Sequence, residues 1–380
     1  MFKIELVKRS SAGARVMKIV WGEKTILTLQ RAVTSTEMNY NSSLRSAKIP
    51  VPNYNETDFF EYRKFYDLIK LRGLYQGDSK LFATHKKELR PRALNNNGKI
   101  RIFRPIINFD AKLNIKDVMA LIDLASHAGF EIITIPDSFY LPTEEYASLM
   151  LKAVEYSKEM AKLGFELVEI MPTINVMNRI GYFKEKLDFT KTAGFNFINI
   201  ENGYYPTYYA HYSALRDFSR KANNICIYGS NTPRIHRADW RTAGVHLYAA
   251  FGQDIISQGI QAPFISKEGK ESVHDDTKSK IKFFIPSQDA LIKRSEYNQL
   301  YGEKMIYASA YCHGETLTSF INKYNNQMLA KIMKIVEFAE SAKTLMQERD
   351  AILGGNYAEL MEKKGTIGKL IKNLSQKVLV

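Results

Sequence analysis

Short apolar runs alternate with amphipathic segments through the middle of this chain, and this alternation most constrains its fold. Segments with helical spacing, such as 115–127 and 143–163, lie between several of the runs. Alternating strands and helices favour a parallel sheet that is covered by helices. Candidate strands at 24–33 and 71–76 bring the number to eight, which predicts an α/β fold built on a (β/α)8 TIM-like barrel. The other runs lie at 100–109, 131–135, 165–171, 195–200, 225–228 and 244–248.

A doubly wound open sheet is the alternative architecture for the same pattern. No G-x-G-x-x-G motif follows any of the runs, which weakens the dinucleotide-binding form of that fold. A strand-rich N-terminal extension with its loop is expected at 1–57, and the main part of the barrel at 58–264, beginning with a helix over 58–71. An insertion, a long helix and a lysine-rich tail, expected at 265–380, form a C-terminal helical extension.

Charge gives the clearest compositional indication of a partner. Lysine and arginine number 54 against 40 acidic residues, so the net charge is +14. A basic chain with 22 Tyr and 21 Phe suits a phosphate backbone whose bases can stack on aromatic rings. The sequence therefore predicts nucleic acid as the partner, with DNA favoured over tRNA, although lysines can also serve solubility alone. A homodimer is left open.

Other classes of protein are excluded by what the sequence lacks. No run of 18 apolar residues occurs, so no transmembrane helix is expected, and the first residues carry no apolar signal-peptide core. Two cysteines exclude a disulfide framework, and the histidines lack the spacing of a zinc motif. We expect a cytoplasmic protein with neither a metal nor a cofactor.

Polar residues follow most of the predicted strands, at the ends where functional residues gather in parallel barrels. Asp137, Glu201 and Asp254 are predicted to be catalytic, because carboxylates can stabilise an oxocarbenium-like sugar or activate water. Asp137 also has a structural interpretation as a turn or cap residue, and Asp254 as a loop residue, whereas a carboxylate at Glu201 is costly unless it is paired or exposed at a site. The residues predicted to bind the substrate are Asp78, Asp110, Tyr140, Asn202, Gly203, Tyr204, Gly229, Ser230, Asn231 and His246.

Several of these segments resemble motifs of a known enzyme family. The turn Gly229-Ser230-Asn231-Thr232-Pro233 resembles Gly-Val-Gly-Thr-Pro, and Asp78-Ser79 resembles the start of Asp-Ser-Gly-Gly-Phe-Gln. The segment 129–142 is similar to a strand that ends in a base-reading aspartate, here Asp137. In this order the motifs resemble the tRNA-guanine transglycosylase superfamily, which includes relatives that exchange bases in DNA. The resemblance implies a (β/α)8 barrel in which a carboxylate attacks the ribosyl carbon and expels guanine.

Two departures from that family bear on the reaction. Its zinc-binding Cys-x-Cys-x-x-Cys set is missing, and Ala249 stands where the nucleophilic aspartate would follow Gly244-Val245. Hydrolysis, in which water attacks the sugar, needs no covalent nucleophile. The sequence thus predicts an enzyme that cleaves an N-glycosidic bond in nucleic acid, most simply a DNA glycosylase that removes a modified base, which would suit genome defence or modification. The alternatives are a base-exchanging transglycosylase on tRNA or DNA, a catalytically inactive nucleic-acid-binding relative that supports a partner, and an unrelated barrel enzyme acting on small sugars or phosphates.

Overall fold

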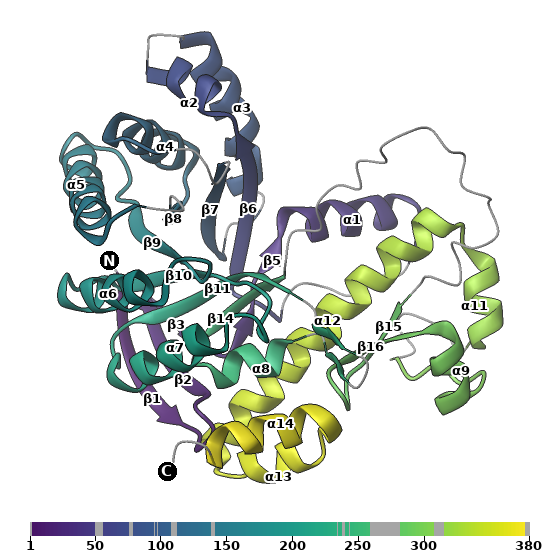
Figure 1. The fold of residues 1–380 in the computed structure, drawn as a ribbon. Coiled ribbons are helices and arrows are strands. Elements are labelled where there is room, and N and C mark those ends of the chain that lie inside the picture. The colour runs from purple at the N-terminus through teal and green to yellow at the C-terminus, as the bar shows by residue number, and fades with distance from the viewer. Residues whose placement is uncertain are drawn as a thin grey trace.

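Eight parallel strands close into a barrel in this protein (Figure 1). The computed structural model describes residues 2–49, 56–75, 79–94, 96, 98–107, 112–137, 141–233, 235–237, 240–242, 244–258, 282–307 and 315–376. The strands β4 (Gln30–Arg31) and β5 (Val33–Thr34) are separated by Ala32 alone and together form the first barrel strand. Six strands follow in order around the barrel: β6 (Phe59–Tyr66), β7 (Ile100–Ile107), β8 (Ile132–Ile135), β9 (Glu169–Asn175), β10 (Phe197–Glu201) and β11 (Cys226–Thr232).

The eighth strand closes the ring. β14 (Ile255–Gln258) pairs in parallel with β11 on one side and with β4 on the other, while β5 pairs in parallel with β6. A sheet whose first strand contacts both its second and its last strand has no open edge. The predicted TIM-like barrel is therefore confirmed, and an open doubly wound sheet is excluded.

Helices follow the strands and cover the outer face of the barrel, as Figure 1 shows. Their ends are encoded locally: before the fourth helix, Asn114 accepts a hydrogen bond from the backbone of Asp117, which caps it in return, and Gly129 ends it at a φ of 84°. The helices are α1 (Ser35–Ser46), α2 (Leu68–Tyr75), α3 (Ser79–Leu94), α4 (Ile115–Ala128), α5 (Thr143–Lys162), α6 (Ile180–Thr192), α7 (Tyr209–Lys221), α8 (Val245–Ala250) and α12 (Asn326–Gly354).

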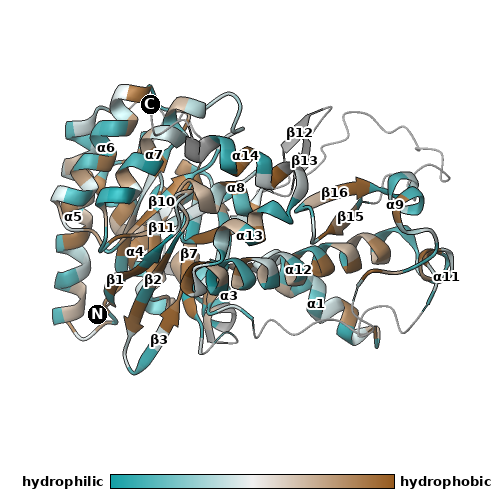
Figure 2. Cartoon of the chain, turned by 90° about the horizontal axis from the view of Figure 1, so that it is seen from below, coloured by the Kyte–Doolittle hydropathy of each residue, from teal (hydrophilic) through white to brown (hydrophobic). Residues whose placement is uncertain are grey.

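A three-stranded antiparallel sheet covers the amino-terminal end of the barrel. It consists of β1 (Phe2–Arg9), β2 (Arg15–Trp21) and β3 (Lys24–Leu27), seen beside the barrel strands in Figure 2. Its apolar face joins Phe2 and Met17 with Phe59 and Phe197 of the barrel in one buried cluster, and the rings of Phe2 and Phe197 meet edge-on at 5.0 Å. The predicted strand-rich extension is thus confirmed, and it seals the end of the barrel opposite the expected active site.

The C-terminal part is largely helical, as the sequence predicted. The long helix α12 packs against α1, against β4 and against the hairpin of β15 (Lys282–Ile285) and β16 (Ala290–Lys293). In the described part of the chain, no helix is long and apolar enough to cross a membrane. The remaining elements are β12 (Ile235–Arg237), β13 (Trp240–Thr242), α9 (Arg294–Tyr301), α11 (Leu317–Lys323), α13 (Tyr357–Glu362) and α14 (Gly365–Gln376).

Three predicted elements are wrong in type. The segment 58–71, predicted as a helix, contains the second barrel strand, and 71–76, predicted as that strand, lies largely in α2. The segment 244–248, predicted as the eighth strand, lies in α8, and the true eighth strand begins at Ile255. Short apolar runs fit a buried helix and a buried strand equally well, and α8 is buried throughout.

Candidate active site at the carboxyl end of the barrel

Side chains that point into the barrel change from apolar to polar along the strands. Every second side chain of β6 points into the barrel, and these are Phe59, Glu61 and Arg63. Their register partners on β7 point the same way and are Ile100, Ile102 and Arg104. The lower lumen is apolar, where Phe59 and both isoleucines join the cluster under the N-terminal sheet. The upper lumen, toward the carboxyl ends of the strands, is charged. The fold therefore places charge at the end where barrel enzymes carry out their chemistry.

Glu61 is the most tightly held carboxylate of this region. It is fully buried and forms ion pairs with Arg63 and with Arg104, while the hydroxyl of Tyr228 donates a hydrogen bond to it. Burial alone would raise the pKa of the Glu61 carboxyl, but the charges of Arg63 and Arg104 together outweigh burial and lower that pKa to about 2. Burial also raises the pKa of Tyr228 well above its usual range, so this phenol stays protonated as a donor. Glu61 thus acts as a fixed negative charge that orients two arginines.

Glu201 ends β10 and reaches the same arginine. Its Oε1 lies 3.2 Å from Nη2 of Arg104, whose Nη1 lies 3.4 Å from Oε1 of Glu61. The Glu201 side chain is 14% exposed, whereas that of Glu61 is wholly buried. One guanidinium thus holds two carboxylates, of which Glu201 alone can be reached from the mouth of the barrel.

Two polar side chains stand beside Glu201 on the neighbouring strands. In register, Asn175 of β9 and Ser230 of β11 both pair with Glu201, so the three point to the same side of the sheet. The Nδ2 of Asn175, the Oγ of Ser230 and the Oδ1 of Asn199, two residues below Glu201, are buried and lack a hydrogen-bond partner among the described residues. Buried polar groups are nearly always paired, so this polar row (Asn175, Asn199, Glu201 and Ser230) has hydrogen-bonding capacity to spare.

Asp137 lies at the end of β8, as predicted, but it faces away from the lumen. Lys186 of α6 binds its Oδ1 at 2.7 Å, and Oδ2 accepts hydrogen bonds from Nδ2 of Asn178 at 2.6 Å and from the backbone nitrogen of Asn175 at 3.2 Å. Burial raises the pKa of the Asp137 carboxyl, although Lys186 and Asn178 oppose the shift. These contacts fasten the end of β8 to the β9–α6 turn and to α6, so Asp137 has a structural role here.

Asp254 lies at the opposite end of the barrel from the predicted site. It precedes β14, and Arg15 of the N-terminal sheet binds both of its oxygens, at 2.9 and 2.7 Å, with both side chains fully buried. The prediction that Asp254 joins Asp137 and Glu201 at one mouth is therefore wrong. The apolar run at 244–248 predicts the eighth strand before Asp254, whereas β14 begins directly after it, so Asp254 lies at the amino end of the strand.

The predicted substrate-binding residues on β10 and β11 divide between the lumen and the outer wall. Ser230 belongs to the polar row. Asn202 is buried outside the lumen and bonds to Gln253 and Tyr212, and the Gln253 side chain occupies the space that a β-carbon at Gly229 would need. These contacts are structural: they fix the outer side of the wall behind the polar row.

The other predicted residues take structural places or lie outside the described part. The Gly203 carbonyl accepts a hydrogen bond from the Tyr248 hydroxyl, Tyr204 packs half-buried against the core, and Asn231 adopts a left-handed backbone with φ of 55°. Nδ1 of His246 contacts Glu348 of α12, with both side chains fully buried. Asp78, Asp110 and Tyr140 lie outside the described residues.

Glu61, Arg63 and Arg104 were not predicted from the sequence. The helical spacing of the segment FFEYRKFY predicts a helix, which would spread its charges over an outer face. Its high content of Phe and Tyr, both favoured in strands, was the available signal. With β6 as a strand, period-two alternation places Glu61 and Arg63 inside the barrel.

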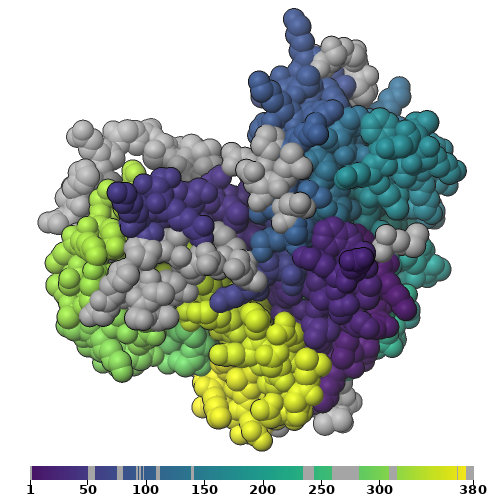
Figure 3. All heavy atoms as spheres, turned by 180° about the vertical axis from the view of Figure 1, so that it is seen from behind, coloured from purple at the N-terminus to yellow at the C-terminus, as the bar shows by residue number. Residues whose placement is uncertain are grey.

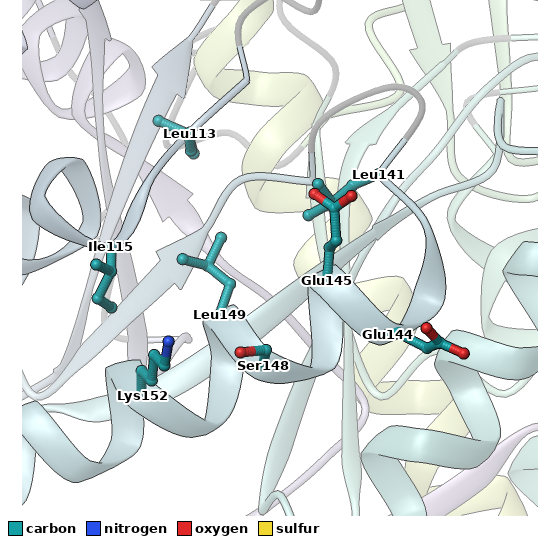
Figure 4. A pocket seen from close by; sticks show the side chains of 8 residues that line it. All are labelled: Leu113, Ile115, Leu141, Glu144, Glu145, Ser148, Leu149 and Lys152. Atoms are coloured by element: carbon teal, nitrogen blue, oxygen red, sulfur yellow. The ribbon is translucent and has the colours of Figure 1, made fainter.

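Neither a metal cluster nor a pocket on the outside of the barrel provides another centre among the described residues. Among the described residues, no group of three or more His, Cys, Asp or Glu could hold a metal ion. A pocket of about 410 Å³ lies between the starts of α4 and α5, outside the lumen, and both apolar and charged side chains line it (Figure 4). Its lining residues are Leu113, Ile115, Leu141, Glu144, Glu145, Ser148, Leu149 and Lys152.

Comparisons with known proteins identify no family. No family model matches the chain, and no curated protein matches its sequence. Solved structures with some similarity include a mandelate racemase/muconate lactonizing enzyme from Bordetella bronchiseptica RB50, at 8% identity and a TM-score of 0.34 over 61% of this chain and 53% of that one. The chain thus spans about half the length of that protein.

Two further structures show the same degree of similarity. A tryptophan synthase from Pyrococcus furiosus has 15% identity and a TM-score of 0.34, with 61% of this chain and 86% of that chain covered. The carboxyl transferase domain of Rhizobium etli pyruvate carboxylase has 10% identity and a TM-score of 0.38, with 84% and 48% covered. Similarity this low carries no argument about function, which must come from the site itself.

Proposed function

We propose that this protein is an enzyme that hydrolyses an N-glycosidic bond in nucleic acid, with DNA favoured over tRNA, and that Glu201 acts on the sugar. The observation that carries the proposal is the position of Glu201. It is a partly exposed carboxylate at the mouth of the lumen, in an ion pair with Arg104 and beside atoms of the polar row that have no hydrogen-bond partner in the described part of the chain.

The chemistry needs one carboxylate next to the sugar. When the bond between C1′ and the base nitrogen breaks, the base leaves with the bonding electrons and takes up a proton from solvent water, and positive charge develops on the sugar. The carboxylate of Glu201 stabilises that charge and accepts a proton from the water whose oxygen forms the new bond to C1′. Glu201 then returns this proton to solvent, so that one water is consumed for each base released. Glu61 serves indirectly, because it fixes Arg104 and through it the orientation of Glu201.

Hydrolysis is favoured over base exchange. In the transglycosylase family, base exchange requires a nucleophilic carboxylate that forms a covalent bond to the sugar, and this carboxylate would stand at the position of Ala249. Ala249 is fully buried in α8, outside the barrel sheet. If water attacks the sugar directly, no nucleophilic carboxylate is needed at that position.

The polar row supports a base as the leaving group. Amide groups such as those of Asn175 and Asn199 can pair with the donors and acceptors along a base edge, and the Ser230 hydroxyl can do either. Together with the net charge of +14, this favours a base within a polyanion over a free sugar.

Base release is the direct test. The purified chain is incubated with DNA and tRNA that carry diverse modified bases, and abasic sites are counted by strand cleavage at alkaline pH or by an aldehyde-reactive probe. We expect abasic sites on at least one substrate, with at least a hundredfold loss for Glu201→Gln. Glu155→Gln, at an exposed position on α5, is the matched control and should retain full activity. Full activity of Glu201→Gln, or no base loss from any substrate, would reject the proposal and leave the inactive relative as the better interpretation.

A further inference from the structure

Half of the net charge of the chain comes from one short segment. Residues 58–107 contain twelve Lys and Arg against five Asp and Glu, a surplus of seven in a chain whose net charge is +14. The two helices of this segment are the most one-sided part, with seven basic residues against two acidic ones over 68–94. In Figures 1 and 3 this segment, drawn in blue, stands out from the rest of the molecule as a ridge. We call β6, α2 and α3 the basic ridge.

The positive charges of α3 share one face of the helix. Lys80 and Lys87 are seven residues apart, and Lys86 and Arg90 are four apart, which places all four on the same side. Lys80, Lys87 and Arg90 are exposed and Lys86 is half-buried. None of the four forms an ion pair with a described residue, whereas Lys64 beneath them is paired with Glu88. Their charge is therefore available to a partner.

Two large apolar side chains at the rim of the barrel lie beside this charge. Phe65 is 64% exposed and Ile69, in the first turn of α2, is 80% exposed. By strand alternation Phe65 continues the inward row of Glu61 and Arg63, and its register partner on β7 is Ile106. Phe65 thus extends the lumen wall above the mouth, where most of its aromatic ring remains exposed.

We propose that the basic ridge binds a single-stranded or locally unpaired stretch of nucleic acid, whose phosphates contact α3 and one of whose bases stacks on Phe65 at the mouth. Positive side chains that track a backbone, combined with an exposed aromatic ring, are the features by which proteins hold unpaired strands. This inference rests on the proposed function, since it supplies the means by which a polymer is presented to Glu201.

Binding is measured without reference to base release. Fluorescence anisotropy with a labelled oligothymidine, against the matching duplex, is recorded over a series of salt concentrations. The charge variant K80E/K87E should bind the single strand at least tenfold more weakly, and its salt dependence should be reduced, with the slope falling by about 0.7 for each phosphate that the variant no longer neutralises. Phe65→Ala should weaken binding by about tenfold with an unchanged salt slope, because stacking releases no counterions.

A matched control separates a local surface from overall charge. K158E/K162E makes the same charge change at two exposed positions on α5 and should bind almost as the unaltered chain does. Equal losses for the two charge variants, or an unaltered affinity in Phe65→Ala, would overturn the proposal. So would binding to vesicles of anionic lipid in preference to the oligonucleotide, since a basic surface with exposed Phe and Ile could instead face a membrane.

The outcome also distinguishes the two proposals. Ridge-dependent binding without base release from any substrate would leave the basic ridge standing and remove the glycosidic reaction. Base release that is unaffected by the ridge variants would support the glycosidic reaction and remove the basic ridge as the binding surface.

Discussion

Arg104 of β7 reaches across the lumen to Glu201 of β10, and the two form an ion pair of 3.2 Å at the carboxyl end of the barrel. The same guanidinium holds Glu61, so a residue on one wall positions carboxylates from two others. A buried arginine and the two carboxylates that it binds stabilise the fold only together, because removing any one of them leaves another buried charge without its partner.

Arg104→Met should therefore cost both stability and activity. We expect the free energy of unfolding, measured by urea titration, to fall by about 2–5 kcal/mol. The reason is that buried Glu61 would lose one of its two cations and would be paired with Arg63 only. Lys112→Met breaks an ion pair with Glu145 in which the side chains are 70% and 49% exposed, and should change stability little. Equal effects of the two substitutions would show that the Arg104 network is not the organising feature of the lumen.

The fall in the free energy of unfolding at acid pH should reveal the ionisation of Glu61. The pKa of this carboxyl is about 2 in the folded chain and near 4.5 in the unfolded one, so the ionised form stabilises the fold. This contribution is fully present above pH 4.5 and is lost as the pH falls through about 2. A gap of this size corresponds to roughly 3 kcal/mol.

Glu61→Gln removes that pH dependence and leaves the other carboxylates in place. Urea midpoints are measured for both chains from neutral pH down to the acid limit of folding. The difference between the two should shrink as the pH falls below 4.5. Parallel curves would contradict a Glu61 that is held ionised by Arg63 and Arg104.

The barrel could be predicted from the sequence because its signal is repeated. Strands such as Ile132–Ile135 and Phe197–Glu201 are apolar runs that begin shortly after a glycine helix cap, and each repeat supports the others. Strand β6 carries a weaker signal. It is rich in Phe and Tyr, but Glu61, Arg63 and Lys64 interrupt its apolar pattern, and the ion partners that let Glu61 and Arg63 lie inside the barrel come from the fold.

The candidate site residues also divide into features that the sequence shows and features that depend on the fold. The position of Glu201 at the end of β10 could be predicted, and a carboxylate that ends an apolar strand is costly unless it is paired or exposed. Asp137 and Asp254 satisfied the same rule but met buried cations, Lys186 and Arg15, which lie far away in the sequence. Only the folded chain shows that Asp137 and Asp254 are fully buried with their cations, whereas Glu201 is paired with Arg104 and stays partly exposed.

The Arg15–Asp254 pair should prove structural. Asp254→Asn is expected to lower the free energy of unfolding by about 3–5 kcal/mol, since Arg15 would remain fully buried without its anion. Binding of oligonucleotide by the folded protein should be unchanged, because the pair lies at the sealed end. Lys18→Met, which removes an exposed ion pair of the same N-terminal sheet, is the control and should alter little. A variant that folds normally but loses base release would return Asp254 to the candidate site.

Ser230→Ala offers a test in which stability and function should move in opposite directions. The Ser230 hydroxyl is buried and unpaired among the described residues, so its removal costs no hydrogen bond and should leave the melting temperature unchanged or higher. Ser157→Ala is the matched control: its hydroxyl donates to the Val168 carbonyl at 2.6 Å, and losing that bond should cost about 1 kcal/mol. If the polar row receives a base, Ser230→Ala should slow base release several-fold while Ser157→Ala does not. A loss of stability in Ser230→Ala as large as in Ser157→Ala would mean that the hydroxyl is already satisfied within the fold, and would remove Ser230 from the substrate-binding residues.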